Sequence, residues 1–269
     1  MSSAKTVLIT GGGAGIGLEM ARLLAARGRR LVLVGRDAAR LQAAADELYQ
    51  THGNEVHAVS IDLSEPGAAQ RLLAHTREQG ITVDTLINNA GSGVIDAHVE
   101  IDPPRIARML QLNVVAVAEL CRGYGEFMKR RRTGHILNIA STAAFQPTPY
   151  LAAYGASKAF VLNFSEALAK ELEDYGVSVS CLAPGPTDTA FFDNVDPRRI
   201  EGGHFFAKGR RGNPREVAQA GVDLMARGGL THVVGAANRC MIFGNRLLPR
   251  ALVAAVSRRM LRPSPVKST

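Results

Sequence analysis

Tyr154, Lys158 and Ser141 are residues whose types and spacing could perform chemistry together. Tyr154 and Lys158 stand four residues apart in Tyr-Gly-Ala-Ser-Lys, and Ser141 lies thirteen residues before the tyrosine. In a helix, residues four apart share one face. A phenol ionises near pH ~10, and a nearby lysine cation lowers that pKa. We therefore expect a phenol tuned to exchange a proton with the oxygen of a carbonyl or an alcohol.

A glycine-rich loop near the N-terminus predicts a nucleotide site. The apolar run from Thr6 to Thr10 is followed by Gly11-Gly-Gly-Ala-Gly-Ile-Gly17 and by a helical pattern from Leu18. Glycines allow the backbone to approach a pyrophosphate, and the N-terminus of a helix offers free N–H groups and a positive dipole end. Because the loop joins a predicted strand to a predicted helix, we expect it to bind a dinucleotide.

Strands alternate with helices along most of the chain. The expected strands cover residues 6–10, 31–34, 55–61, 85–88, 135–140, 177–182 and 231–234, and the expected helices start at residue 18 and cover 38–50, 66–79, 104–130 and 152–174. This alternation predicts an α/β fold with a single-domain, Rossmann-like, doubly wound parallel sheet of about seven strands and helices on both faces.

Polar residues and glycines gather at the predicted strand ends, where such sheets bind their ligands. They are Gly11, Gly35, Asp62, Asn88, Ser141 and Pro184. We therefore expect one shared cleft along this edge of the sheet.

These motifs resemble those of the short-chain dehydrogenase/reductase family in its compact form. The matches are Thr10-Gly-Gly-Gly-Ala-Gly-Ile-Gly17, Asp62, Asn88-Asn-Ala-Gly91, Asn113, Ser141, Tyr154-x-x-x-Lys158 and Pro184-Gly185, from residue 6 to about residue 235. The resemblance implies an NADPH-dependent carbonyl reductase or alcohol dehydrogenase. Its substrate would be a mostly apolar ketone or alcohol, with ketoacyl, steroid and polyketide-like compounds all open.

The resemblance also implies roles for individual residues. The catalytic set would be Asn113, Ser141, Tyr154 and Lys158, in which Asn113 holds a water in a proton relay to Lys158. Lys158 would also bind the nicotinamide ribose. The cofactor site would comprise Gly11, Gly13, Gly15, Ile16, Gly17, Arg36, Asp62, Leu63, Asn89, Ala90, Gly91, Tyr154, Lys158, Pro184, Gly185, Thr187 and Thr189.

The end of the second predicted strand decides between NAD and NADP. A carboxylate there binds the adenine ribose hydroxyls and repels a 2′-phosphate. This chain has Gly35 at that position, followed by Arg36, whose guanidinium matches phosphate geometry. We expect NADP(H), with Asp37 as a carboxylate that could turn inward and Arg40 as a weaker second phosphate ligand.

Some residues have a competing interpretation. Thr142 is the rival hydroxyl to Ser141, and Tyr150 is the rival phenol to Tyr154. The thirteen-residue offset favours Ser141, and Tyr150 has no lysine four residues later. The alternative for Asn113 is a side chain bonded back to the backbone.

Composition restricts the class of protein. The chain has 269 residues, a net charge of +8 and no apolar run long enough for a spanning helix or a secretory signal at its start. We expect a cytoplasmic protein with reduced, buried thiols at Cys121, Cys181 and Cys240, and no metal. We expect no nucleic-acid partner, because the basic residues are dispersed and the run from Lys129 to Arg132 suits a helix C-terminus.

Two segments lie outside the motifs. Residues 189–213 predict a lid containing Phe191, Phe192, Phe205 and Phe206. Residues 240–269 form a basic, amphipathic extension interrupted by Pro249. We expect the extension to pack on its own chain or on another subunit, with peripheral contact to an anionic membrane as the alternative. Related reductases form homodimers or homotetramers, so we expect the same here.

The sequence leaves two other functions open. One is a nucleotide-sensing regulatory protein that has lost turnover, although the complete set of Asn113, Ser141, Tyr154 and Lys158 argues against it. The other is an isomerase or dehydratase that holds its cofactor permanently.

Overall fold

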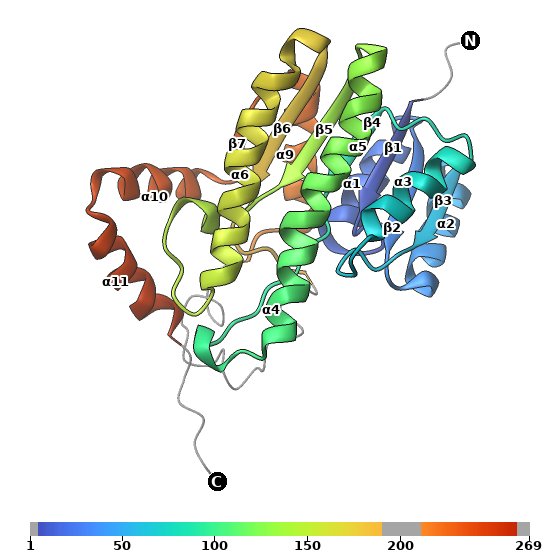
Figure 1. The fold of residues 1–269 in the computed structure, drawn as a ribbon. Helices are drawn as coiled ribbons and strands as arrows, with labels where there is room; N and C mark the ends of the chain where they lie inside the picture. The colour runs from blue at the N-terminus through green and yellow to red at the C-terminus, as the bar shows by residue number, and fades with distance from the viewer. Residues whose placement is uncertain (1–4, 190–210, 263–269) are drawn as a thin grey trace.

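A parallel β-sheet forms the centre of the protein, whose computed structural model describes residues 5–189 and 211–262. The strand order is β3-β2-β1-β4-β5-β6-β7 (Figure 1). The strands are β1 (Thr6–Thr10), β2 (Arg30–Gly35), β3 (Val56–Ser60), β4 (Thr85–Asn88), β5 (Gly134–Ile139), β6 (Val177–Ala183) and β7 (Thr231–Val233). The predicted doubly wound sheet of seven strands is confirmed.

Helices cover both faces of this sheet. One face carries α1 (Gly15–Ala25), α2 (Ala38–His52) and α9 (Pro214–Arg227), and the other carries α3 (Ala68–Glu78), α5 (Ala116–Arg131) and α6 (Ala152–Leu172). Val7 and Ile9 of β1 pack in the first layer, whereas Leu8 between them packs in the second. Because both faces are buried, the central strands β1 and β2 have continuous apolar centres instead of alternating with polar residues.

The predicted helix over residues 104–130 is interrupted in the structure. α4 (Pro103–Leu110) passes into a π-helical segment, η2 (Gln111–Val115), and then into α5. Asn113 lies within η2 and is completely buried. A π segment shifts the helical register by one residue, and such segments are frequent at functional sites.

Helix α9 was not predicted, although its boundary signals are present. Asn213 caps its N-terminus by accepting a hydrogen bond from the Arg215 amide at 2.8 Å, and Pro214 occupies the first turn. Gly228 ends the helix in the left-handed conformation, with φ of 71°. Short 3₁₀ turns also connect elements at η1 (His98–Glu100), η3 (Thr142–Phe145) and η4 (Glu173–Tyr175).

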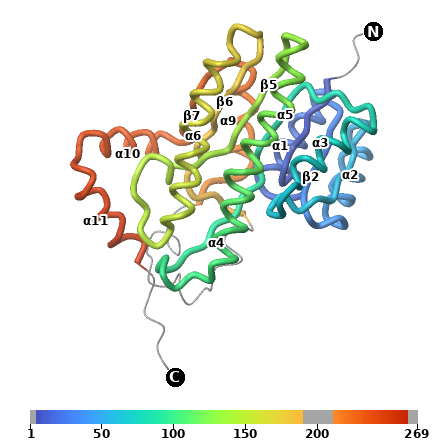
Figure 2. Tube along the Cα trace, in the orientation of Figure 1, coloured from blue at the N-terminus to red at the C-terminus, as the bar shows by residue number. Residues whose placement is uncertain are grey.

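The C-terminal extension forms two helices, α10 (Ala236–Leu247) and α11 (Arg250–Leu261), which meet at Pro249. They lie at one edge of the molecule, apart from the sheet (Figure 2). Ile242, Val253 and Leu261 are buried against the rest of the chain, as expected for packing of the extension on its own chain. No helix in the described ranges is long and apolar enough to cross a membrane.

Two other expectations have different outcomes. Cys121 and Cys181 are buried free thiols as expected, but Cys240 is exposed on α10, so the expectation for that residue is wrong. The predicted lid at residues 189–213, including Phe191, Phe192, Phe205 and Phe206, lies almost entirely outside the described residues.

Candidate active site

A cavity of about 760 Å³ follows the carboxyl ends of the parallel strands. Residues just after or at the ends of six strands line it: Gly11, Gly35, Asp62, Asn89, Ser141 and Pro184. From β1 the sheet is extended on one side by β2 and β3 and on the other side by β4 to β7, so the order of the strands reverses between β1 and β4. Ligands of open α/β sheets bind beyond the carboxyl ends of the strands at such a point. The shared cleft expected from the sequence is therefore present.

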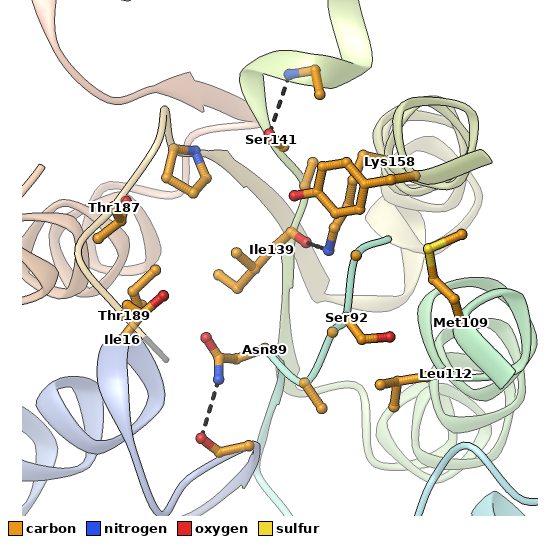
Figure 3. Close-up of a pocket in the computed structure, with 18 of the residues that line it drawn as sticks. Ile16, Asn89, Ser92, Met109, Leu112, Ile139, Ser141, Lys158, Thr187 and Thr189 are labelled. Atoms are coloured by element: carbon orange, nitrogen blue, oxygen red, sulfur yellow. Dashed lines mark hydrogen bonds between the residues drawn. The ribbon is translucent and has the colours of Figure 1, made fainter. Parts of the chain in front are cut away.

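Ser141, Tyr154 and Lys158 lie together at one part of this cavity. Ser141 follows β5, while Tyr154 and Lys158 lie one turn apart on α6. Ser141 Oγ accepts a hydrogen bond from the Ala143 amide at 3.1 Å. Lys158 Nζ donates to the Ile139 carbonyl at 2.9 Å (Figure 3) and lies 5.9 Å from the centre of the Tyr154 ring.

Burial sets the protonation states of this group. It raises the pKa of Tyr154 to about 12, and a hydrogen bond with Ser141 opposes that change. It lowers the pKa of Lys158 to about 8. The structure does not show the expected lowering of the phenol pKa by Lys158, because burial of the phenol dominates and the ammonium group is directed at the Ile139 carbonyl. At neutral pH the Tyr154 phenol therefore keeps its proton.

Asn113 lies beside this group, and hydrogen bonds to neighbouring residues fix its side chain. Its Nδ2 donates to the Ser92 carbonyl at 2.9 Å and to Ser157 Oγ at 3.0 Å, and its Oδ1 accepts from the Ser92 amide at 3.0 Å. A Cβ placed on Gly91 would lie 3.3 Å from both Asn113 Oδ1 and Lys158 Nζ. The water relay stays a prediction, since only part of the Oδ1 acceptor capacity is free for it.

The glycine loop forms a tight cradle at the start of α1. Gly11 and Gly15 have φ of 67° and 54°, the left-handed region that glycine enters without strain. A Cβ on Gly17 would lie 2.2 Å from the Gly11 carbonyl oxygen, so the turn requires glycine there. Within the described residues no side chain caps α1, which leaves its N-terminus suited to an anion.

The end of β2 presents a cation to the cavity. Gly35 and Arg36 both line it, and Arg36 is close enough to Asp62 to favour the charged carboxylate. Asp37 instead caps α2 by accepting from the Arg40 amide at 3.0 Å, and its other oxygen lies 3.8 Å from Arg40 Nε. Asp37 therefore caps α2 and does not turn inward to the cofactor site, and its partner in the structure is Arg40.

Asp62 lies in a polar network that includes an unexpected residue from α4. Its Oδ1 accepts from the amide and hydroxyl of Ser64 at 2.9 and 2.7 Å, and Arg108 Nη2 lies 2.9 Å from its Oδ2. Burial alone would raise the pKa of Asp62, but the Ser64 hydrogen bonds and the charges of Arg108 and Arg36 outweigh it and lower that pKa.

Asn89 fixes the floor of the cavity to the glycine loop. Its Nδ2 donates to the carbonyls of Thr10 and Gly11 at 3.0 and 3.3 Å, and one of these bonds is drawn in Figure 3. Thr10 Oγ1 accepts from the amides of Asn89 and Ala90, both at 3.0 Å. The sequence had indicated Asn89 and Ala90 as lining residues, but not this clamp by Thr10.

The remaining predicted residues fall into two groups. Ile16, Leu63, Ala90, Gly91, Pro184, Gly185, Thr187 and Thr189 line the cavity with those above. Gly13, Gly17 and Asn113 are not among the described lining residues, but Gly17 packs on Gly11 and Asn113 bonds to Ser92, both of which line the cavity.

Among the lining residues that sequence reasoning missed, two groups come from helices. Arg105, Arg108, Met109 and Leu112 come from α4 and η2, and Met241 and Leu261 come from α10 and α11. Their spacing is that of ordinary amphipathic helices, so only the packing of these helices over the strand ends reveals them.

The chain matches known proteins over most of its length. Residues 5–199 match the family described as short chain dehydrogenase. A 3-oxoacyl-(acyl-carrier-protein) reductase, FabG, of Chlamydia trachomatis is 29% identical over 235 residues, which are 86% of this chain and 93% of that protein.

Solved structures agree with this match. A short-chain dehydrogenase from Sphingobium yanoikuyae in complex with NADPH is 32% identical, with a TM-score of 0.79 over 90% of this chain and 94% of that one. A 7β-hydroxysteroid dehydrogenase is 25% identical, with a TM-score of 0.83 over 94% of this chain and 96% of that one. With the family match and the cleft described above, the chain belongs to the short-chain dehydrogenase/reductase family and is an NAD(P)-dependent oxidoreductase.

Proposed function

We propose that this protein is an NADPH-dependent carbonyl reductase that acts on a mostly apolar ketone, and in reverse on the corresponding alcohol. One observation carries the proposal. A single cavity joins the proton-transfer group of Ser141, Tyr154 and Lys158 to the cation at Arg36 and the glycine cradle at Gly11. A reaction between a dinucleotide and a carbonyl compound requires both a group that transfers a proton and a site that binds the dinucleotide.

The cofactor is NADP(H). The end of β2 offers Gly35 and the cation of Arg36 in place of the carboxylate that would bind an unphosphorylated ribose, and Asp37 is occupied in capping α2. The glycine cradle at the N-terminus of α1 suits the pyrophosphate. The relative from Sphingobium yanoikuyae also holds NADPH.

The residues near Tyr154 support a reduction at neutral pH. The cofactor supplies hydride chemistry when it is bound. The Ser141 hydroxyl orients the carbonyl oxygen of the substrate, and Tyr154, neutral because of its pKa of about 12, donates a proton to that oxygen. Lys158 is predominantly cationic below its pKa of about 8 and stabilises the phenolate that remains.

The apolar part of the lining supports an apolar substrate. It includes Val94, Met109, Leu112, Leu151, Met241 and Leu261. Such walls bind by excluding water from apolar surface and leave orientation to the few polar groups. The relatives that act on 3-oxoacyl and hydroxysteroid compounds fit this character, and we propose the same broad class for this chain.

A panel of ketones with purified protein tests the function. We expect NADPH oxidation with bulky apolar ketones, and slower oxidation with small polar ones, followed by its absorbance at 340 nm. Binding of NADPH without turnover on any ketone or alcohol would favour a regulatory protein. Cofactor that copurifies and does not exchange would favour an isomerase or dehydratase.

The wider organisation of the protein is also part of the proposal. We propose that residues 1–269 form one domain that assembles as a homodimer or homotetramer, which sedimentation velocity would test. Cytoplasmic location stays a prediction from the sequence, and fractionation of expressing cells would test it.

A further inference from the structure

The outer face of α10 and α11 carries a concentration of exposed apolar side chains. Of twelve large apolar residues exposed in the described part of the chain, six lie here, between 42% and 72% exposed: Phe243, Leu247, Leu248, Leu252, Val256 and Met260. Scattered single apolar residues are normal on a surface, but a contiguous group marks an interaction site.

Helical spacing places the exposed apolar residues of α11 on one side of that helix. Leu252, Val256 and Met260 recur every four residues along α11 and therefore lie on one side of the helix. Val253 and Leu261, shifted by one position, form the buried stripe that attaches α11 to the protein. The exposed stripe is thus additional to the apolar surface that the fold uses.

The charged side chains of α10, α11 and their ends have one sign. Six arginines of the two helices and their ends are exposed: Arg239, Arg246, Arg250, Arg258, Arg259 and Arg262. The sequence contains no Asp or Glu after Asp223. Arg259 falls seven residues after Leu252, which places it on the same side of α11 as the apolar stripe.

We propose that the outer face of α10 and α11 docks on the surface of an anionic lipid bilayer. Exposed apolar side chains can enter the headgroup region, while arginines bind lipid phosphates. A second copy using the same face would bring six arginines against six others, which disfavours symmetric self-association there. Each helix has twelve residues, which suits a helix lying on a membrane instead of spanning it.

The same two helices form part of the cavity wall. Met241 of α10 and Leu261 of α11 line the cavity, and Asn245 of α10 donates a hydrogen bond to Gln146, another lining residue. Docking would therefore hold the cavity wall beside the lipid. If the proposed function is correct, an apolar ketone dissolved in the bilayer could reach the site from there, although docking itself does not depend on that function.

Vesicle sedimentation of the full chain tests the proposal. We expect binding to vesicles of phosphatidylcholine with 30% phosphatidylglycerol, and weak binding to phosphatidylcholine alone. Salt at ~0.5 M should reduce binding, because screening shortens the range of charge attraction. Each arginine near an anionic surface contributes roughly fivefold, so Arg258→Gln with Arg259→Gln should weaken binding roughly twenty-fivefold.

Matched variants separate this face from general charge and apolarity. Arg71→Gln with Arg77→Gln removes two exposed charges from α3, on another part of the molecule, and should have little effect. Phe243→Ser should weaken binding, whereas Tyr49→Ser on α2 should not, although both side chains are 64% exposed. NADPH affinity and oligomer size should be unchanged in all four variants.

Three outcomes would overturn the proposal. One is the absence of vesicle binding by the full chain, and another is equal loss in the α3 and α11 variants. The third is a change in oligomer size, with vesicle binding intact, when Phe243 or the two arginines are replaced; that result would assign the face to another subunit.

Discussion

Tyr154 holds its proton at neutral pH, because burial raises its pKa to about 12. The side chain lines the cavity beside Ser141 and Lys158, whereas Tyr150, the other phenol in this segment, is not among the described lining residues. Tyr154→Phe should lower kcat by ~10²–10⁴-fold, the usual contribution of a proton-transfer group, while NADPH binding is retained. Steady-state kinetics and fluorescence titration of NADPH measure the two quantities.

Tyr150→Phe is the matched control for that prediction. Tyr150 has a φ of 66°, and its carbonyl accepts a hydrogen bond from the Asp96 amide at 2.9 Å, neither of which depends on its hydroxyl. The kcat of Tyr150→Phe should stay within a few-fold of that of the unmodified protein. A large loss for Tyr150→Phe with little loss for Tyr154→Phe would mean that the wrong phenol has been chosen.

Lys158 should reduce the stability of the folded protein. Burial lowers its pKa from 10.5 to about 8, so between these values the unfolded chain holds a proton that the folded chain has lost. Stability therefore rises with pH across this window, and below pH 8 the buried charge costs roughly 3 kcal/mol. Lys158→Met should increase the free energy of unfolding at pH 7 by roughly 1–3 kcal/mol, since it also loses the bond to Ile139, and should abolish turnover.

Urea denaturation at several pH values measures that effect. The stability difference between Lys158→Met and the unmodified protein should shrink as the pH rises from 7 to 10, because the amine then becomes neutral in the folded state. A difference that does not change with pH would show that the burial of charge is not its cause.

Arg36 should determine the preference for the phosphorylated cofactor. It lines the cavity after Gly35, while the nearest carboxylate in sequence, Asp37, is occupied in capping α2. A charge-assisted hydrogen bond contributes about 1.5–3 kcal/mol, so Arg36→Ala should weaken NADPH roughly tenfold to a hundredfold and NADH much less. Calorimetric titration of both cofactors tests this, and equal affinities in the unmodified protein would contradict it.

At the scale of elements, regular patterns predicted the sheet and most helices. Strands buried on both faces have continuous apolar runs, and Asp37 and Gly53 mark the ends of α2 as capping rules predict. The π segment at Asn113 could not be predicted, because its hydrogen bonds to Ser92 and Ser157 join residues distant in sequence. Those hydrogen bonds to distant residues, and not the local helix propensity, compensate for the change in helical register at η2.

The contact of α4 with the loop after β3 gives a prediction at this scale. Arg108 of α4 lies 2.9 Å from Asp62 and 3.1 Å from Glu65, and also donates to Ser64 Oγ. We expect this contact to position Asp62, which the family resemblance places near the adenine ring. Because Arg108 is half exposed and each exposed pair contributes only ~0.2–1 kcal/mol, Arg108→Gln should weaken NADPH by only about threefold to tenfold.

The control for Arg108 is an ion pair of the same kind elsewhere. Arg131→Gln removes the 2.7 Å contact with Asp84, which lies before β4 at the opposite end of the strands from the cavity. It should leave both NADPH affinity and kcat unchanged, whereas Arg108→Gln should change the affinity and leave kcat nearly constant. A fall in kcat as large as the fall in affinity would indicate that Arg108 acts on the π segment and not on Asp62.

At the scale of the whole molecule, the cavity combines parts that the sequence could and could not indicate. The strand-end residues carry recognisable motifs, because backbone approach and proton transfer restrict which residue types are useful there. Met241 and Leu261 are ordinary apolar residues of a helical pattern, and their position over the cavity depends on how α10 and α11 fold back. The extension expected to pack on its own chain or on a subunit is therefore also a wall of the cavity.

That arrangement predicts a role for Leu261 in substrate size. Leu261 and Val253 both lie on α11 and are 8% and 6% exposed, but only Leu261 is among the described residues that line the cavity. Leu261→Ala removes apolar contacts at ~0.8 kcal/mol per methylene, so KM for a bulky apolar ketone should rise about tenfold. KM for a small ketone and the affinity for NADPH should change little. Val253→Ala should lower the melting temperature without altering KM, and equal changes of KM in both variants would show that Leu261 acts through the stability of α11 and not through contact with substrate.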